Sequence, residues 1–337
     1  MDVLALTFDQ VASTVRPPKG NLRALRDLRA AYRRLVRGES EEERLESGFV
    51  LQAAVHPVAR HNREGELVKF VQQTTDGYEI ESVIVPMRRR GKSWRSLCVS
   101  SQIGCARGCV FCETARLGLR RQLSASEIVG QVVAARRIFD ADIRNVVFMG
   151  MGEPFDNLDE VIRAIEILCD RSGLSFGKSQ LRISTAGRAD GLRRLAALGW
   201  RRLNIAVSLN APNDEIRSRI MPINRVEPMA ALRQAMLEYP LRNCQFFMIE
   251  YVLIPGVNDA PEHARELAAY LKPIPSCVNV IPCNPRRDSP FEAPDDETVQ
   301  RFLGTLRDAG QYCKARVTKG RSHMAGCGQL GNRALAR

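Results

Sequence analysis

The feature that most constrains the fold is a regular alternation of short apolar runs with amphipathic helical stretches, which begins at Ser96. Repeated strand–helix units build a parallel β-sheet, either closed as a barrel or open, because each helical crossover returns the chain to the same edge. The sequence therefore predicts an α/β fold. The expected strands are Leu97–Ser101, Asn145–Met149, Leu181–Thr185, Leu203–Leu209, Phe246–Leu253, Val278–Pro282 and Ala315–Thr318.

The residues before this alternation follow other patterns. Asn21–Gly38 carries leucines on one helical stripe and arginines on another, which predicts an amphipathic helix. Leu67–Gln72 and Tyr78–Pro86 are predicted strands, joined by a hairpin at Asp76-Gly77. The expected domains are a small basic helical domain (1–48), a β extension (49–95), the α/β barrel domain (96–320) and a C-terminal loop (321–337).

The chain is strongly basic, with a formal net charge of +12 and a pI near 9.5. Such a surplus favours polyanionic partners, nucleic acid first and an anionic membrane surface second, although a basic metabolic enzyme is an equal alternative. Arginines on one helical stripe can contact RNA or can simply form a solvated face. The two basic clusters are Arg23, Arg26, Arg33 and Arg37, and then Arg88, Arg89, Arg90, Lys92 and Arg95.

The sequence also indicates where the protein works. No apolar run reaches the length of a membrane span, and the amino terminus, with Asp2 and no basic residues, does not resemble a signal peptide. We therefore expect a cytoplasmic protein without membrane attachment. In that reducing compartment the ten cysteines are expected to be reactive or metal-binding thiols rather than a disulfide framework.

The strongest chemical signal is Cys105-Ala-Arg-Gly-Cys109-Val-Phe-Cys112. Three closely spaced thiolates fit a 4Fe–4S cluster, which takes one thiolate per iron and here leaves one iron open. The open iron can chelate the amino and carboxylate groups of S-adenosylmethionine (SAM), and Phe111 before the last cysteine completes the radical-SAM signature. The alternatives are a zinc site, which usually needs four ligands, or three cysteines buried by chance.

Polar residues follow several of the expected strands at the carboxyl edge, where barrel enzymes place their sites. The first run is Gly150-Met-Gly152-Glu153-Pro154, in which the glycines let the backbone approach a ligand and Glu153 can pair with an ammonium group. Ser184-Thr-Ala-Gly187 and Ser208-Leu-Asn210 also end strands, and their side chains can bond a carboxylate or ribose. Each signal is weak alone, and a tight turn explains the first equally well.

Taken together, these motifs resemble the RlmN/Cfr family of radical-SAM adenine methyltransferases. The resemblance extends from Glu81 to Leu330 and includes the three-cysteine motif. The other matching segments are ESVIVP, LCVSSQIGC, SASEIVGQV, MGMGEP, ISTAG, SLNAPNDEIR, MPIN, EYVLIPGVND, NVIPCNP and AGCGQL.

The resemblance implies a partial (β/α)6 radical-SAM barrel, a 4Fe–4S cluster and SAM as cofactors, and RNA as substrate: 23S ribosomal RNA and, for RlmN, also transfer RNA. It implies a flavodoxin-like electron donor and action as a monomer. Cys105, Cys109 and Cys112 would bind the cluster. The residues implied to contact SAM are Gly152, Glu153, Ser184, Ser208, Leu209, Asn210 and Asn284.

Two further cysteines gain a role from the resemblance. Cys327 would carry a methyl group that adds to carbon 2 or 8 of adenine, and Cys98 would form a disulfide with it to release the product. Glu81 would act as an acid or base near the adenine. Met149 would lie beside the reacting sulfur, although packing in the core explains it equally well.

The chain departs from the family pattern near Cys327 and at Asn210. Arg321-Ser322-His323 replaces the family's acidic run before the cysteine, and Asn210 replaces a histidine. These changes leave two alternatives open: the same two-cysteine methylation of a non-ribosomal or small-molecule adenine-like substrate, or a non-catalytic iron–sulfur protein that binds RNA.

Overall fold

The computed structural model describes residues 1–18, 20–89, 91–285, 289–316, 320 and 324–331. Arg90 of the second basic cluster and the divergent Arg321–His323 lie outside the described residues. The chain forms two compact units, each assembled from separate stretches of sequence. The first unit contains 1–103, 121–151 and 156–181, and the second contains 104–120, 152–155 and 182–337.

A mixed sheet organises the first unit, with strand order β9-β6-β5-β4-β3. The strands β3 to β6 form an antiparallel meander, whereas β9 runs parallel to β6 after the crossover through a helix. The buried faces of β4 and β5 are rich in valine and isoleucine, as expected for strands packed on a core. Their bounds are Val58–Glu64 (β3), Leu67–Gln73 (β4), Glu79–Arg89 (β5), Lys92–Val99 (β6) and Ile143–Phe148 (β9).

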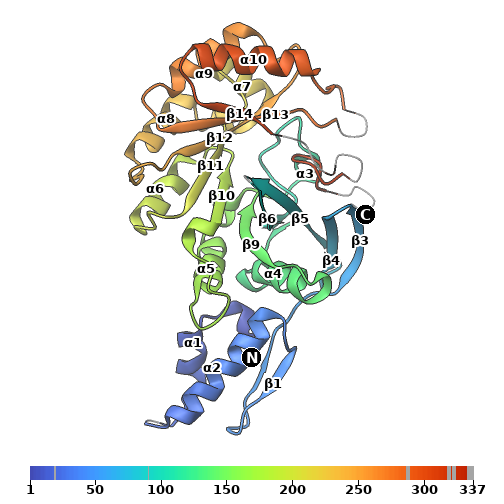
Figure 1. Cartoon of the computed structure of the whole chain (residues 1–337), viewed down its shortest axis with the longest axis vertical. Helices are drawn as coiled ribbons and strands as arrows, with labels where there is room; N and C mark the ends of the chain where they lie inside the picture. Colours follow the sequence, from blue (N-terminus) through green and yellow to red (C-terminus); the bar gives the residue numbers. More distant parts are fainter. Residues whose placement is uncertain (19, 90, 286–288, 317–319, 321–323, 332–337) are drawn as a thin grey trace. The chain divides into compact units, whose positions relative to one another are not determined.

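The helices of the first unit include the predicted amphipathic one, α2, which spans Leu22–Arg37 (Figure 1). The Asn21 side chain caps its first turn, and Gly38 ends it in a left-handed conformation. Its apolar stripe is buried from Leu28 onward, but Leu22 is 79% exposed. Other elements of the unit are α1 (Phe8–Val15), β1 (Glu42–Arg44), β2 (Val50–Gln52), β7 (Gln102–Ile103), β8 (Arg121–Gln122), α4 (Ala125–Phe139) and α5 (Leu158–Cys169).

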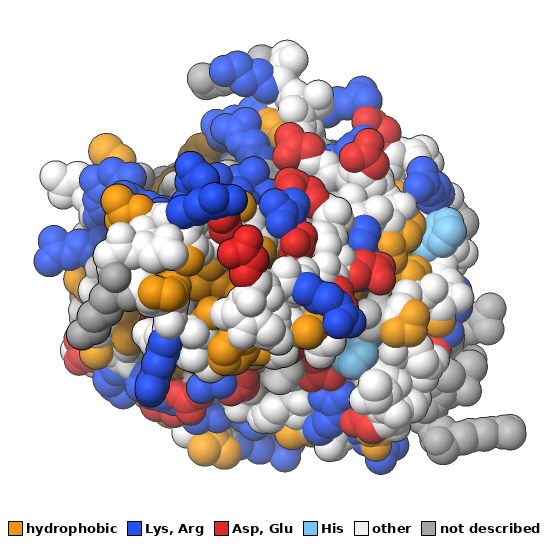
Figure 2. Space-filling model, turned by 90° about the horizontal axis from the view of Figure 1, so that it is seen from below, with side chains coloured by type: hydrophobic (Ala, Val, Ile, Leu, Met, Phe, Trp, Pro, Cys, Tyr) orange, Lys and Arg blue, Asp and Glu red, His pale blue; other side chains and the backbone are white. Residues whose placement is uncertain are grey.

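The arginine stripe of α2 is divided in its contacts. Arg33 and Arg37 donate hydrogen bonds from Nε to the carbonyls of Ser172 and Gly173, at 3.2 and 3.3 Å. Arg23 and Arg26 are exposed and lie near Asp27. Figure 2 shows one face of the molecule, on which acidic side chains lie among the lysines and arginines. Part of the predicted basic stripe therefore has a structural role within the unit.

A parallel sheet organises the second unit, with strand order β14-β13-β12-β11-β10. β12 and β13 pair over their whole length, from Phe247 opposite Ser276 to Leu253 opposite Pro282. Both strands are buried almost throughout, which explains their nearly continuous apolar sequence. The bounds are Leu181–Thr185 (β10), Asn204–Ser208 (β11), Phe247–Leu253 (β12), Ser276–Pro282 (β13) and Cys313–Ala315 (β14).

Helices connect these parallel strands, and α9 and α10 pack together beside the last of them (Figure 1). Leu303 and Leu306 of α10 are fully buried, whereas the opposite face of the helix carries exposed charge. The helices are α3 (Glu113–Arg116), α6 (Ala189–Ala197), α7 (Asp214–Ile220), α8 (Met229–Glu238), α9 (Pro261–Leu271) and α10 (Asp296–Asp308).

The α/β class, the strand–helix alternation and the hairpin at Asp76-Gly77 are confirmed. The structure adds β3, whose sequence VARHNRE is polar and mostly exposed and therefore gave no strand signal. The expected division at residue 95 falls inside β6, which pairs with β5 on one side and β9 on the other. The four expected domains stay a prediction about the order of segments along the chain.

An ionic cluster at the start of α4 makes the first unit sensitive to acid. The Glu127 carboxylate accepts bonds from both terminal nitrogens of Arg121, at 2.8 and 2.9 Å, and lies 3.3 Å from Nε2 of His56. Burial raises the pKa of Glu127, but the bonds from His56 and Arg121 outweigh burial and lower the pKa to about 2 from 4.5. This stabilisation is complete above the unfolded pKa and is lost as the pH falls towards the folded one.

We predict that Glu127→Gln lowers the free energy of unfolding by about 2 to 3 kcal/mol at neutral pH. Glutamine keeps the helix cap but removes the charge that Arg121 binds. The difference in the free energy of unfolding from the wild type should shrink as the pH falls from about 5 to about 3, because protonation of the wild-type carboxylate removes its stabilising charge. Urea unfolding followed by circular dichroism measures both.

Glu238→Gln is the control, because Glu238 pairs with Arg193 on the exposed surface at 3.2 Å. Its effect on the free energy of unfolding should be small at every pH, because solvent screens an exposed ion pair. A loss for Glu127→Gln that does not change with pH would contradict the role of its charge.

Candidate active site

The cysteine loop lies in the second unit and is held by its own backbone. The amide of Cys105 donates to the carbonyl of Gly118 at 3.2 Å, and the amide of Cys112 donates to the carbonyl of Cys109 at 3.1 Å. Val110 donates to the carbonyl of Ile220 at the end of α7, at 3.0 Å. Cys105 is buried, and Cys109 and Cys112 are half-buried. The loop therefore has a fixed course that does not depend on disulfides.

Gly104, directly before the first cysteine, is required by two constraints at once. Its φ is +75°, and a Cβ atom at this position would lie 1.7 Å from the carbonyl oxygen of Gly118. The close approach of the two backbone segments allows the hydrogen bond between Cys105 and Gly118. Gly118 has a similar φ of +62°, but a Cβ there would meet no atom within 4 Å.

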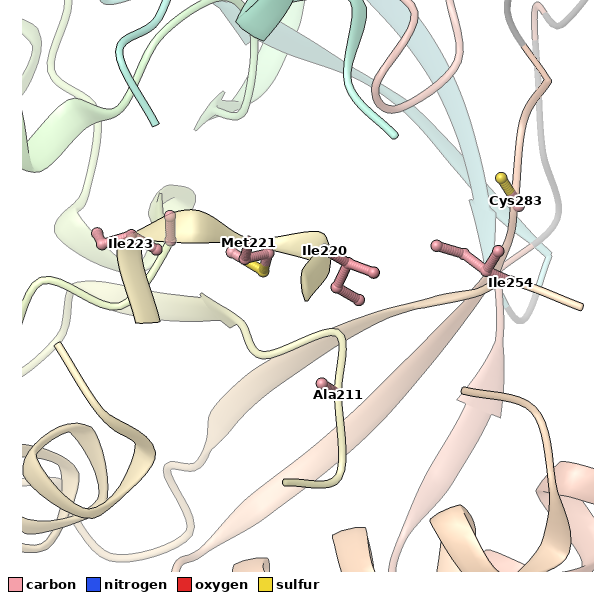
Figure 3. Close-up of a cluster of buried hydrophobic side chains, with 7 residues drawn as sticks. Ala211, Ile220, Met221, Ile223, Ile254 and Cys283 are labelled. Carbon is pink, nitrogen blue, oxygen red and sulfur yellow. The ribbon is translucent and has the colours of Figure 1, made fainter. Parts of the chain in front are cut away.

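Figure 3 shows side chains of a buried apolar cluster in the second unit. Cys109, Val110 and Phe111 pack against it. Apolar walls exclude water and strengthen electrostatic interactions within the site. The cluster consists of Ala186, Ala211, Ile220, Met221, Ile223, Ile254 and Cys283.

The electrostatics of the loop favour a cationic occupant. Burial raises the pKa of the Cys109 thiol well above its ordinary value, and the charges of Cys112, Cys105 and Glu153 raise it further, whereas Arg217 opposes them. Thiolates so close to each other and to a carboxylate repel one another unless positive charge lies between them. Iron ions supply such charge, and their binding displaces the thiol protons.

The motif supplies three thiols and implies a 4Fe–4S cluster. Within the described part of the chain, no three His, Cys, Asp or Glu side chains lie close enough together to hold a single metal ion. A tetrahedral zinc site requires such convergence. A 4Fe–4S cluster does not, since each thiolate binds a different iron of a larger object. Three cysteines in one loop offer one thiolate to each of three irons and leave the fourth iron open, which fits the cluster.

The segment that carries Cys327 is bonded directly to the cysteine loop. The amide of Glu113 donates to the carbonyl of Gly328 at 2.7 Å, and Oγ1 of Thr114 donates to the carbonyl of Leu330 at 2.6 Å. Nδ2 of Asn284 donates to the carbonyl of Cys327 at 3.2 Å. A thiol more than two hundred residues along the chain is thus held next to the end of the three-cysteine motif.

Buried polar groups surround the Cys327 thiol. Burial raises the pKa of Cys327, Arg316 lowers it by charge and by a hydrogen bond, and Glu250 and Cys112 raise it. Glu250 accepts a hydrogen bond from Asn279 at 2.6 Å and lies 4.0 Å from Arg316. Arg316 therefore favours the thiolate of Cys327, whereas burial and the charges of Glu250 and Cys112 favour the protonated thiol.

Glu153 is fixed at the carboxyl end of β10. It is 3% exposed, and its two oxygens accept backbone hydrogen bonds from Ala186 at 2.6 Å and Phe155 at 3.0 Å. Each carboxylate oxygen has a second lone pair, so the group can still accept a ligand ammonium. Gly152 precedes it in the same short segment of the second unit.

The serines expected to contact SAM lie on neighbouring strands. Oγ of Ser184 on β10 is 3.5 Å from Oγ of Ser208 on β11, and both residues are half-buried. Leu209 is fully buried, and its amide donates to the carbonyl of Glu250. Such a hydroxyl pair at the carboxyl edge of a parallel sheet suits a polar ligand.

The two asparagines expected at the SAM site already have protein partners. Asn210 is 2% exposed, accepts a bond from Val252 at 2.8 Å and donates to the sulfur of Met221 at 3.2 Å. Asn284 contacts the Cys327 segment as described. Both residues hold the protein in place, and their contact with SAM stays a prediction.

The remaining candidates belong to the first unit. Cys98 lies on β6, opposite Val83 and Val147 of the neighbouring strands. Glu81 lies on β5, is 1% exposed and pairs with Nζ of Lys69 at 2.8 Å. Met149 follows β9 and is half-buried. Their roles with Cys327 stay predictions.

Arg217 was not singled out from the sequence, although it proves central to the second unit. It is fully buried on α7, and burial lowers its pKa. Its guanidinium donates to the carbonyls of Ala186 at 2.6 Å and Leu209 at 3.1 Å and to the side chain of Asn224 at 2.8 Å. Its position on α7, after Asp214 and Glu215, is typical of an exposed charged residue. No feature of the sequence therefore distinguishes Arg217 from the other arginines.

Known proteins are similar to this chain over most of its length. The model of the radical SAM superfamily matches residues 99–268. "Probable dual-specificity RNA methyltransferase RlmN 1" of Protochlamydia amoebophila is 43% identical over 281 residues, which cover 83% of this chain and 77% of that protein. The chain belongs to the RlmN/Cfr family of radical-SAM methyltransferases.

Other relatives support the membership over a larger part of the chain. "Dual-specificity RNA methyltransferase RlmN" of Syntrophotalea carbinolica is 41% identical over 323 residues, covering 93% of this chain and 84% of that protein. The crystal structure of a radical SAM methyltransferase from Sphaerobacter thermophilus is 34% identical, with a TM-score of 0.86 and coverage of 98% and 99%. The expected radical-SAM barrel fold is thereby confirmed.

Membership of the RlmN/Cfr family makes this protein a SAM-dependent radical methyltransferase that uses a 4Fe–4S cluster and SAM. The alternative of a non-catalytic iron–sulfur protein is therefore wrong. Among the described residues, no helix is both long and apolar enough to cross a membrane.

We predict that Gly104→Ala abolishes cluster binding, whereas Gly118→Ala largely preserves it. Both substitutions place alanine at a positive φ, which costs about 1 kcal/mol. Only the first also drives a methyl group into a carbonyl oxygen. Iron content and the visible charge-transfer absorption after anaerobic reconstitution measure the difference. Equal iron contents in the two variants would contradict the close backbone approach.

Proposed function

We propose that this enzyme methylates a ring carbon of adenine in RNA and that Cys327 carries the methyl group. The observation that carries the proposal is the bonding of the Cys327 segment to Glu113 and Thr114, directly after Cys112. A cysteine outside the cluster motif thus approaches the place where SAM chemistry begins. Its thiol is available to accept a methyl group, because no disulfide engages Cys327.

A carrier cysteine answers a chemical difficulty. Carbons 2 and 8 of adenine are electrophilic, so they do not attack the methyl group of SAM as an ordinary nucleophile does. When bound, the cluster and SAM supply methyl groups and the one-electron chemistry that activates the methyl on sulfur. The protein has to hold the carrier sulfur, the adenine ring and the thiol that releases the product close together and in the reactive orientation.

Three residues of the chain supply these functions in the proposal. Cys327 bears the methyl group on its sulfur, and the carbon of that group bonds to the ring, so that a thioether links the ring to Cys327. Cys98 attacks that sulfur as a thiolate, so that a disulfide forms while the bond to the product carbon breaks. Glu81, paired with Lys69, exchanges the proton of the ring carbon.

Residues at the carboxyl ends of the second unit's strands bind SAM in this proposal. Glu153 accepts the ammonium group, and the hydroxyls of Ser184 and Ser208 bond the carboxylate or ribose. Backbone around Gly152 and Leu209 lines the site. Asn210 and Asn284 hold the surrounding loops through their bonds to Val252 and Cys327 and approach SAM from there.

RNA is the proposed substrate class for two reasons. Relatives that cover most of this chain are named dual-specificity RNA methyltransferases. The net charge of +12 suits a polyanion. We propose 23S ribosomal RNA as the substrate, with transfer RNA as the second, and methylation at carbon 2 or 8. The proposal includes a cytoplasmic enzyme that acts as a monomer with a flavodoxin-like electron donor, as the resemblance implies.

The two cysteine variants should fail in different ways. Cys327→Ala removes the carrier, so neither S-methylcysteine nor methylated adenine should form. Cys98→Ala can still load the methyl group and add it to the ring, but it cannot release the product. This variant should therefore accumulate protein bound covalently to RNA. Peptide mass spectrometry and nucleoside analysis after a single incubation distinguish the two results.

Cys244→Ala is the matched control, because Cys244 is exposed on a loop and has no proposed role. It should turn over as the wild type does. Normal turnover by Cys327→Ala, or multiple turnovers by Cys98→Ala, would overturn the two-cysteine proposal. Methylation of free adenine nucleotides in preference to RNA would favour the small-molecule alternative instead.

A further inference from the structure

A groove in the first unit carries residues that the proposed chemistry does not use. Its volume is about 420 Å³, which is in the range of small-ligand sites. It is lined by the start of β6, the end of α4, the start of β9 and the loop after α5. The residues of interest there are Trp94, Arg136, Arg144 and Phe176, none of which is a candidate for cluster, SAM or methyl transfer.

Each arginine of the groove lies over an aromatic ring. Cζ of Arg144 is 5.4 Å from the centre of the Trp94 ring, and Cζ of Arg136 is 5.4 Å from the centre of the Phe176 ring. With the Asn145 amide oriented to suit both its neighbours, its oxygen accepts a bond from the indole nitrogen of Trp94 at 2.9 Å. These contacts hold two planar guanidinium groups against two aromatic rings at the groove.

The groove carries two arginines and also the carboxylate of Asp142. Nε of Arg136 is buried without a hydrogen-bond partner, and Arg144 is exposed. Burial lowers the pKa of Arg136, with Arg37 adding to this effect while Asp142 and Glu39 oppose it. Arg136 is half-buried, and a guanidinium with an unsatisfied Nε gains from an added anionic acceptor.

We propose that this groove binds a single-stranded nucleotide of the RNA substrate other than the methylated adenine. Phosphate oxygens would bond Arg136 and Arg144, and a base would extend the stack formed by Trp94 and Arg144. Bases splayed from single strands stack on aromatic rings and on guanidinium planes, whereas the bases of an A-form duplex are shielded. This inference rests on the proposed function, since it assigns part of the RNA contact to named residues.

The test separates the phosphate contact from the stacking contact. Affinity for a labelled single-stranded oligoadenylate is measured over a range of salt concentrations with the cluster-loaded enzyme. Arg144→Glu should weaken binding and reduce the slope of log K against log salt by about 0.7, the loss of one phosphate contact. Trp94→Leu should weaken binding by about 5- to 100-fold and leave the slope unchanged.

Two further variants check charge and geometry. Arg265→Glu makes the same change of charge on the exposed surface of α9, where Arg265 pairs with Glu262. It should change affinity far less than Arg144→Glu does. Arg144→Lys keeps the positive charge but loses the planar guanidinium that can stack on a base. It should therefore retain the slope of log K against log salt and lose part of the affinity. Iron content and cleavage of SAM to 5′-deoxyadenosine should equal the wild type in every variant.

The outcomes distinguish this inference from the proposed function. If the wild type methylates RNA while Arg144→Glu and Trp94→Leu bind it with wild-type affinity and slope, the groove assignment is wrong and the function stands. Equal losses from Arg265→Glu and Arg144→Glu would also overturn the groove, because general charge would then explain binding. A wild-type enzyme that neither binds nor methylates RNA would overturn both.

Discussion

The buried guanidinium of Arg217 connects the parts of the second unit that make its site possible. A guanidinium presents several donors in a fixed plane. Here they bond the carbonyls of Ala186 after β10 and Leu209 after β11 and the side chain of Asn224 after α7. The apolar cluster formed by residues such as Ile220 and Met221 lies in the same region and supports the cysteine loop. Removing a buried charge from its acceptors leaves each of them unsatisfied, so these loops depend on one side chain.

The cysteine loop and the C-terminal segment form one structure on this support. Glu113 and Thr114 belong to the turn of helix after the last motif cysteine, and their bonds to Gly328 and Leu330 join regions far apart in sequence. In both bonds the acceptor in the Cys327 segment is a backbone carbonyl, which every residue type provides. The path of the Cys327 segment can therefore persist although its sequence nearby departs from the family pattern.

The basic character of the chain has more than one physical meaning. Arg121 and Arg217 are engaged in ionic or hydrogen-bonding clusters, and Arg33 and Arg37 bond loop carbonyls. A net charge taken from the sequence counts all of these alongside arginines that face solvent. Only the latter group, with Arg144 as an example, is available to neutralise phosphate.

The sequence by itself determined the secondary structure with strong periodicity and the chemistry with fixed local spacing. The strand Leu181–Thr185, the helix after Asn21 and the motif of Cys105, Cys109 and Cys112 depend on neighbouring residues, so a local pattern is sufficient to find them. The family resemblance supplied Cys98, Glu81 and Cys327, which no local pattern distinguishes from packing residues.

Tertiary structure alone decided which polar residues hold the site together. Arg217, Asn210 and Asn284 read as ordinary surface or ligand-binding residues, but the fold gives them buried partners on other strands and loops. The polar strand Val58–Glu64 forms because β4 offers it an edge, not because its own sequence prefers a sheet. Such roles depend on contacts between residues distant in sequence, and those contacts exist only after the chain has folded.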